Sequence, residues 1–63
     1  MFIVRGKSEI GSASFACGTT EQALDKVLEL LGRRFQDISV TDPNGRRFTA
    51  DEFQRAFNDD AFR

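Results

Sequence analysis

The thiol of Cys17 is the most reactive side chain in this sequence, and it belongs to the only cysteine. Cys17 lies two residues before Thr19, which is predicted to cap a helix, and the start of a helix favours thiolate chemistry. A thiol enzyme also needs a base, and the sequence has no histidine. Alternation places Cys17 on the same side of its strand as Phe15. We therefore predict that Cys17 is a small buried side chain rather than a nucleophile.

Part of a calcium-loop pattern surrounds Gly45. With Gly45 at the required glycine of an EF-hand loop, Asp42 and Asn44 occupy ligand positions. The first ligand position then falls on Val40, and the twelfth falls on Asp51 instead of a glutamate. A structural zinc site is excluded because it needs four Cys or His ligands, and the chain has one Cys and no His. The segment favours a hairpin turn, and we predict neither a metal nor a cofactor.

Two arginine pairs, Arg33-Arg34 and Arg46-Arg47, are the candidate phosphate contacts. On one continuous face they would support an alternative function, that of a nucleic-acid-associated regulator with an Arg-rich edge. The chain has nine basic and ten acidic residues, which gives a formal net charge of −1. This balance is typical of an ordinary soluble surface, so nucleic acid is the less favoured partner.

The sequence predicts no pocket in which a pair of carboxylates could act as acid and base. The candidate carboxylates fall on helix faces that the apolar pattern leaves exposed, or in the C-terminal tail, and they are Asp25, Glu29, Asp51, Glu52, Asp59 and Asp60. The glycines do not have the spacing of a nucleotide-binding loop. We therefore predict that the protein is not an enzyme.

Two capping boxes predict where the helices begin. Thr19 precedes Gln22, and Thr49 precedes Glu52, at the spacing that lets each pair satisfy free backbone N–H groups. Apolar residues then recur every three or four positions, which predicts a first helix over about 20–31 and a second helix after Thr49.

The end of the first helix is predicted from Gly32. Glycine suits the left-handed residue that follows many helices, so we expect Gly32 to occupy that position. Glu29 and Arg33 are spaced to form an ion pair on the exposed side of the same helix.

Four short segments have the composition of strands, namely residues 2–5, 12–17, 36–41 and 46–48. Gly6 is predicted to end the first strand, and an irregular turn to Gly11 connects it to the second. Between the third and fourth strands, residues 42–45 predict a type I turn with Gly45 at a positive φ.

The order of these elements predicts one α+β domain over residues 1–63. The expected ββαββα arrangement is a four-stranded antiparallel sheet with two helices packed on one face, and residues 58–63 form a frayed tail. The predicted core consists of the inward-facing apolar side chains: Phe2, Val4, Phe15, Cys17, Leu24, Val27, Leu28, Leu31, Ile38, Val40, Phe48, Phe53 and Phe57.

The other face of the predicted sheet offers an interaction surface, for which Ile3, Arg5, Ser14 and Ala16 are the candidate residues. The strand over 2–5 is a second candidate if it lies at the sheet edge. A chain of 63 residues buries only about 60% of its unfolded surface, and this one lacks a disulfide framework, so self-association would add stability. We predict a non-enzymatic binding or assembly module whose partner is another protein or a second copy in a homodimer.

The helix opening Thr-x-x-Gln-Ala, the turn Asp-x-x-Gly-Arg and the capped terminal helix resemble those of small bacterial ββαββ(α) proteins of unknown function. This resemblance implies a cytoplasmic bacterial protein and transfers no site residues. No apolar run approaches the ~20 residues of a membrane helix. The apolar residues 2–4 are too few for a signal sequence, so we expect a cytoplasmic protein with no membrane partner.

Overall fold

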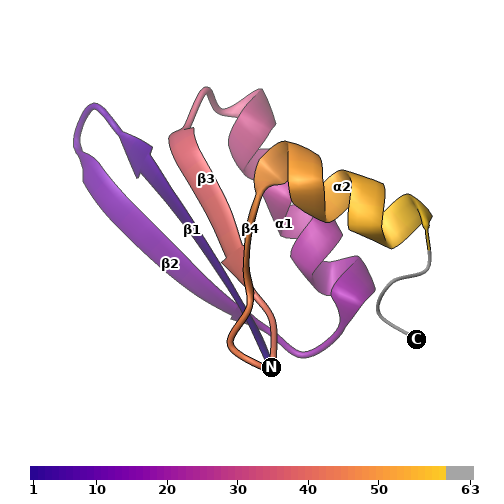
Figure 1. Cartoon of the computed structure of the whole chain (residues 1–63). Coiled ribbons are helices and arrows are strands. Elements are labelled where there is room, and N and C mark those ends of the chain that lie inside the picture. The colour runs from indigo at the N-terminus through magenta and orange to yellow at the C-terminus, as the bar shows by residue number, and fades with distance from the viewer. Residues whose placement is uncertain (60–63) are drawn as a thin grey trace.

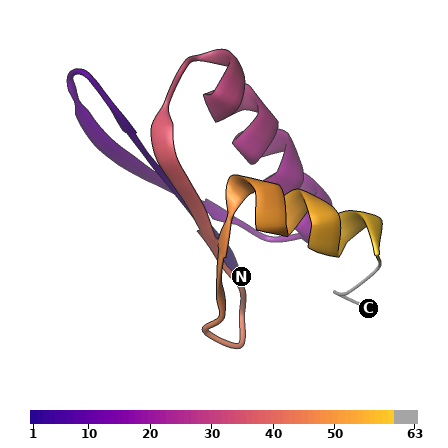
Figure 2. The same cartoon turned by 45° about the horizontal axis from the view of Figure 1, so that its top comes forward.

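The computed structural model describes residues 1–59 and shows an α+β fold with a single sheet. Its elements in chain order are β1 (Phe2–Ser8), β2 (Gly11–Cys17), α1 (Thr20–Gly32), β3 (Gln36–Thr41), β4 (Arg47–Thr49) and α2 (Ala50–Asn58). The strands are antiparallel in the order β2-β1-β3-β4, and both helices lie on one face of the sheet (Figures 1 and 2). The predicted ββαββα architecture is confirmed.

β1 and β2 form a hairpin in continuous register along both strands. Its loop is residues 9–10, and Gly11 next to the loop has a φ of 140°, which favours glycine. The prediction that β1 ends at Gly6 was wrong, because its pairing with β2 continues to Ser8. The tip of this hairpin extends away from the helices (Figure 2).

The strand order corrects one expectation about the sheet edge. Residues 2–5 belong to β1, which pairs with β2 on one side and with β3 on the other. β1 is therefore an inner strand, and the two edges of the sheet are β2 and β4. The physical reason is that α1 crosses the sheet and returns the chain beside β1 rather than beside β2.

α1 begins at the predicted cap, but the capping box is only half formed. The Oγ1 of Thr19 accepts a hydrogen bond from the N–H of Gln22 at 3.1 Å. The Oε1 of Gln22 accepts from the N–H of Gly18 at 3.0 Å instead of from Thr19. One free N–H of the first turn and one of the preceding loop are thereby satisfied.

α1 ends in a Schellman motif that contains no glycine at its left-handed position. The N–H of Phe35 donates to Leu30 O and the N–H of Arg34 donates to Leu31 O, at 3.0 and 3.1 Å. Arg34 has a φ of 63°, whereas Gly32 is still helical. The prediction that Gly32 takes the left-handed position was therefore wrong. The helix runs to the point where Phe35 can pack against the core.

The start of β3 contains a bulge opposite Gly6. Arg5 pairs with Ser39 and Lys7 pairs with Gln36, so β3 has one extra residue between these pairs. Asp37 lies in the extra segment with a φ of 53°, the left-handed conformation typical of one class of bulge.

Gly6 itself is buried beneath Phe35. A Cβ built on Gly6 would lie 3.1 Å from the Cδ2 atom of Phe35 and 3.4 Å from the Cγ1 atom of Ile38. The absence of a side chain at Gly6 therefore lets the Phe35 ring approach the backbone of β1.

The turn between β3 and β4 is held by the buried carboxylate of Asp42. Its Oδ1 accepts from the N–H groups of Asn44 and Arg46 at 3.0 and 2.7 Å, and its Oδ2 accepts from the Nε of Arg46 at 2.9 Å. Gly45 has a φ of 87°, which confirms the predicted positive φ. Burial raises the pKa of Asp42, but the hydrogen bonds and charge of Arg46 outweigh it and hold the pKa below its ordinary value.

α2 starts with a complete capping box. The Oγ1 of Thr49 accepts from the N–H of Glu52 at 3.1 Å, and the Oε1 of Glu52 accepts from the N–H of Thr49 at 2.9 Å. The helix includes Asn58, and Asp59 is its C-cap, so the predicted tail over 58–63 begins too early. The remaining residues of that tail, 60–63, lie outside the described part of the chain.

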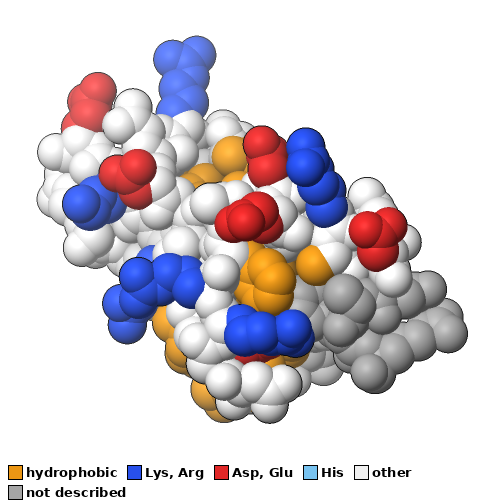
Figure 3. All heavy atoms as spheres, in the orientation of Figure 1, with side chains coloured by type: hydrophobic (Ala, Val, Ile, Leu, Met, Phe, Trp, Pro, Cys, Tyr) orange, Lys and Arg blue, Asp and Glu red, His pale blue; other side chains and the backbone are white. Residues whose placement is uncertain are grey.

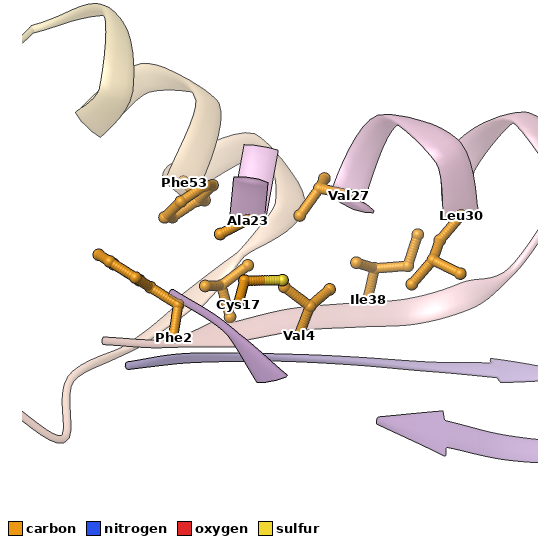
Figure 4. Packing of buried hydrophobic residues seen from close by; sticks show 9 residues of the cluster. Phe2, Val4, Cys17, Ala23, Val27, Leu30, Ile38 and Phe53 are labelled. Atoms are coloured by element: carbon orange, nitrogen blue, oxygen red, sulfur yellow. The ribbon is translucent and has the colours of Figure 1, made fainter. Parts of the chain in front are cut away.

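The core lies between the sheet and the helices, and its central contacts come from both helices (Figure 4). Phe53 of α2 contacts Phe2 and Phe48 edge to face, with ring centroids 6.0 and 6.2 Å apart. Within residues 1–59 the buried apolar side chains are Phe2, Val4, Cys17, Ala23, Val27, Leu30, Ile38, Val40 and Phe53.

The predicted side of α1 was partly wrong. Ala23, Val27 and Leu30 face the sheet, whereas Leu28 and Leu31 are 48% and 43% exposed. A helix with apolar residues on two sides can bury only one side fully. In α1 the side with Ala23 is buried, because this small residue lets the helix approach the sheet closely (Figure 4). The predicted core residues Phe15, Leu24 and Phe48 are partly buried against the cluster, and Phe57 is half-buried.

Candidate functional site

The face of the sheet opposite the helices is the principal candidate site. Ile3 pairs with Ala16, and Arg5 pairs with Ser14, so the four predicted residues lie on one face of β1 and β2. Alternation along each strand extends this surface over the whole sheet. The open face, as we name it, consists of Ile3, Arg5, Lys7, Ser12, Ser14, Ala16, Ser39, Thr41, Arg47 and Thr49.

Short polar side chains and a few cations dominate the open face. Arg5, Lys7 and Arg47 are exposed, and Ile3 is the large apolar side chain among them, partly covered by its neighbours. Around these residues are serine and threonine hydroxyls. The surface can therefore donate hydrogen bonds to an acidic partner and offers one apolar contact.

A shallow hollow of about 240 Å³ lies at the hairpin end of the open face. Arg5 and Lys7 line it from β1, Ser12 and Ser14 line it from β2, and Asp37 lines it from the bulge of β3. The acid of Asp37 offsets part of the positive charge of the two cations. This hollow is therefore a mixed-charge depression rather than a dedicated anion site.

Sequence reasoning missed Lys7 and Asp37 as members of this surface. Lys7 was assigned to a turn because Gly6 was expected to end the strand. The signal that could have revealed it is the continued alternation of Ile3, Arg5 and Lys7 on one side. Asp37 reaches the surface through the bulge, for which the sequence contains no glycine as a signal.

The two arginine pairs lie at opposite ends of β3. Arg33 and Arg34 follow α1 and precede β3, whereas Arg46 and Arg47 follow it (Figure 1). A strand of six residues spans about 20 Å, so the four side chains do not form one continuous face. Arg46 is further engaged by Asp42 and by the ring of Phe48, 5.7 Å away.

Cys17 lies at the end of β2 with its side chain in the core. The predicted burial of Cys17 is confirmed, and a thiol in this position is not presented to solvent. In the described part of the chain, no three His, Cys, Asp or Glu side chains gather as a metal site would require. Asp42 uses its carboxylate to hold a turn.

The helix face of the molecule carries interspersed acidic and basic side chains with small apolar areas between them (Figure 3). Glu29 was predicted to pair with Arg33, but its carboxylate lies 2.9 Å from the Nζ of Lys26. The hydrogen bond and charge of Lys26 lower the pKa of Glu29. Lys26 also places its Nζ 4.7 Å from the centroid of the Phe15 ring on β2.

Comparisons with known proteins add no family to these observations. No protein-family model, curated protein or solved structure matches the chain. Neither helix among residues 1–59 has the length and apolarity needed to span a membrane.

Proposed function

We propose that this protein is a small non-enzymatic binding module that recognises another protein through the open face of its sheet. The observation that supports this proposal is the asymmetry of the sheet, because both helices cover one side and leave the other uncovered (Figure 2). Antiparallel sheets can expose one side to water, so exposure alone would not suggest binding. The chemistry of the exposed side is what suggests a partner.

That chemistry suits a protein surface with carboxylates around an apolar contact. Arg5 stands beside Ile3 in the middle of the face, and Lys7 and Arg47 lie farther out on two other parts of it. Serine and alanine on β2 lose little side-chain entropy when they are covered. A central apolar residue with cations around it is an arrangement that protein interfaces use.

The test is affinity capture from an extract of the source organism with the immobilised chain. We expect a partner that wild type retains and that the double variant Ile3→Ser, Arg5→Glu loses by about tenfold or more, as removal of a central contact does. Arg55→Glu, an exposed charge change on α2, is the matched control and should retain the partner. Nuclease treatment of the extract separates a protein partner from one held through nucleic acid.

Both variants should keep the wild-type circular dichroism spectrum, because neither changes a residue of the buried core. The double variant should unfold at a somewhat lower temperature, since Ile3 is partly covered in an inner strand. The proposal fails if the three proteins capture the same set of partners. It also fails if nuclease removes every partner that depends on the open face.

A further inference from the structure

The two edges of the sheet differ in how they are protected against pairing with another chain. β4 has three residues, begins with Arg47 and passes directly into α2. β2 has seven residues in uninterrupted register with β1, without a proline, a charge or a bulge. Natural sheets usually shorten, charge or bulge an edge strand, since a long plain edge can pair with another strand. β2 has none of these protective features.

The stretch around β2 is also unusual in composition. Charged residues make up 30% of the chain, yet residues 10–20 contain none. Elsewhere the exposed faces of this protein are rich in charge, as α1 and α2 show (Figure 3). An exposed edge strand without charge is suited to close approach by another backbone.

We infer that β2 pairs with β2 of a second copy, antiparallel, about a twofold axis at Ser14. This interface goes beyond the proposed recognition of a partner by the open face. Ser14 is the central residue of Gly11–Cys17, so this register pairs every residue of the strand with one in the second copy. The product is a continuous eight-stranded sheet, twice the four strands of one chain.

In this register the side chains of β2 are complementary to those of β2 in the second copy. On the covered side, Phe15 of each copy lies opposite Ala13 of the other, so a large side chain meets a small one twice. On the open side, Ser12 lies opposite Ala16, and Ser14 lies opposite itself. No charge lies opposite a like charge, and paired side chains of these sizes can be accommodated at strand spacing.

The neighbouring flank of α1 is compatible with this pairing. Lys26 lies over Phe15 of β2 and is bonded to Glu29, so both signs of charge occur beside the strand. A helix flank with both positive and negative charges does not repel the same flank of the second copy, as a flank with charges of one sign would. A twofold axis perpendicular to the sheet also places both sets of helices on the same side. The two open faces then form one continuous surface.

The interface is modest, which determines how it should be measured. Pairing of seven edge residues buries less than the about 800 Å² per partner of a standard interface, so we expect a dimer that dissociates on dilution. Sedimentation velocity of the full chain over a wide range of concentrations should show a monomer–dimer equilibrium. A single monomeric species at every concentration overturns the inference.

Charge substitutions at Ser14 test the register. Ser14→Lys and Ser14→Glu each place two like charges, one from each copy, opposite one another at the twofold axis. Each variant should therefore weaken self-association by about fivefold. An equimolar mixture of these two variants should associate about tenfold more tightly than either variant alone. Ser14 is exposed, so each variant should retain the wild-type thermal midpoint at dilutions where the chain is monomeric.

Ala16→Lys is the matched control on the same strand and the same side, because its lysine would lie opposite Ser12 rather than opposite itself. We expect it to weaken the dimer less than Ser14→Lys. Equal effects of the two variants, or a mixture no tighter than its components, overturn the twofold register. Partner capture by the open face is a separate measurement, so failure here leaves that proposal to its own test.

Discussion

The covered face and the open face of the sheet are built from alternate residues of the same strands. On β1, Val4 is fully buried beneath the helices, whereas its neighbours Ile3 and Arg5 lie on the open face. On β3, Val40 is fully buried and Thr41 faces the other way. The covered face carries nearly all the apolar packing, and the open face carries hydroxyls and cations.

This difference separates the residues that stabilise the fold from those that we propose for recognition. A chain of this length has little stability to lose, so substitutions on the covered face are expected to unfold it. The open face contributes little to the core, and its residues can vary with a binding task at small cost in stability.

The largest effect is expected where α1 meets the covered face. Leu30 is 1% exposed, so Leu30→Ala should lower the free energy of unfolding by about 2–5 kcal/mol, which approaches the whole stability of a domain of this size. Leu28→Ala, on the half-exposed side of the same helix, should cost less than about 1 kcal/mol. Urea unfolding followed by circular dichroism measures both. Equal losses would mean that α1 has no preferred buried side.

A smaller effect is expected at Gly6, where the covered face has no room for a side chain. Gly6→Ala should destabilise the protein by about 1–2 kcal/mol, because its Cβ would press against the Phe35 ring. Gly32→Ala is the matched control: it lies in α1 with open space around it and should stabilise by about 0.5–1 kcal/mol. Thermal midpoints that move in opposite directions confirm the contrast. An increase in the thermal midpoint of both variants would show that the Phe35 ring moves to make room for the new Cβ.

The smallest effect is expected at the rim of the covered face, where Asp42 holds the turn between β3 and β4. The pKa of folded Asp42 lies below the ordinary value of 3.8, so its contribution to stability is present at neutral pH and is lost as the pH falls through the folded pKa. Asp42→Asn should therefore be less stable than wild type at pH 7. The difference should shrink below about pH 4.

Urea midpoints of the two proteins between pH 2 and pH 7 measure this difference. Asn44→Ala is a useful comparison in the same turn, since it leaves the Asp42 carboxylate and its bond to Arg46 in place. A difference between wild type and Asp42→Asn that stays constant down to pH 2 would contradict the assigned role of the charge.

The candidate site was partly predictable because strand alternation is a local property. The shared face of Ile3, Arg5, Ser14 and Ala16 followed from period-two alternation and needed only correct pairing of two neighbouring strands. Lys7 and Asp37 were missed because a strand can continue through a glycine and because a bulge moved one acid to the surface. The two arginine pairs lie at opposite ends of β3, and this separation becomes visible only once the direction of β3 in the sheet is known.

Local sequence patterns were enough to predict where both helices begin and which residues of β1 and β2 share a side. Capping and alternation are interactions between near neighbours, so Thr19, Thr49 and the period of two were sufficient for these predictions. Three features could be seen only in the folded chain: which apolar stripe of α1 is buried, that β1 is an inner strand, and that Arg34 and Asp37 have left-handed backbone conformations. These choices depend on contacts between distant segments, because the path of α1 over the sheet and the packing of Phe35 on Gly6 exist only once the layers have met.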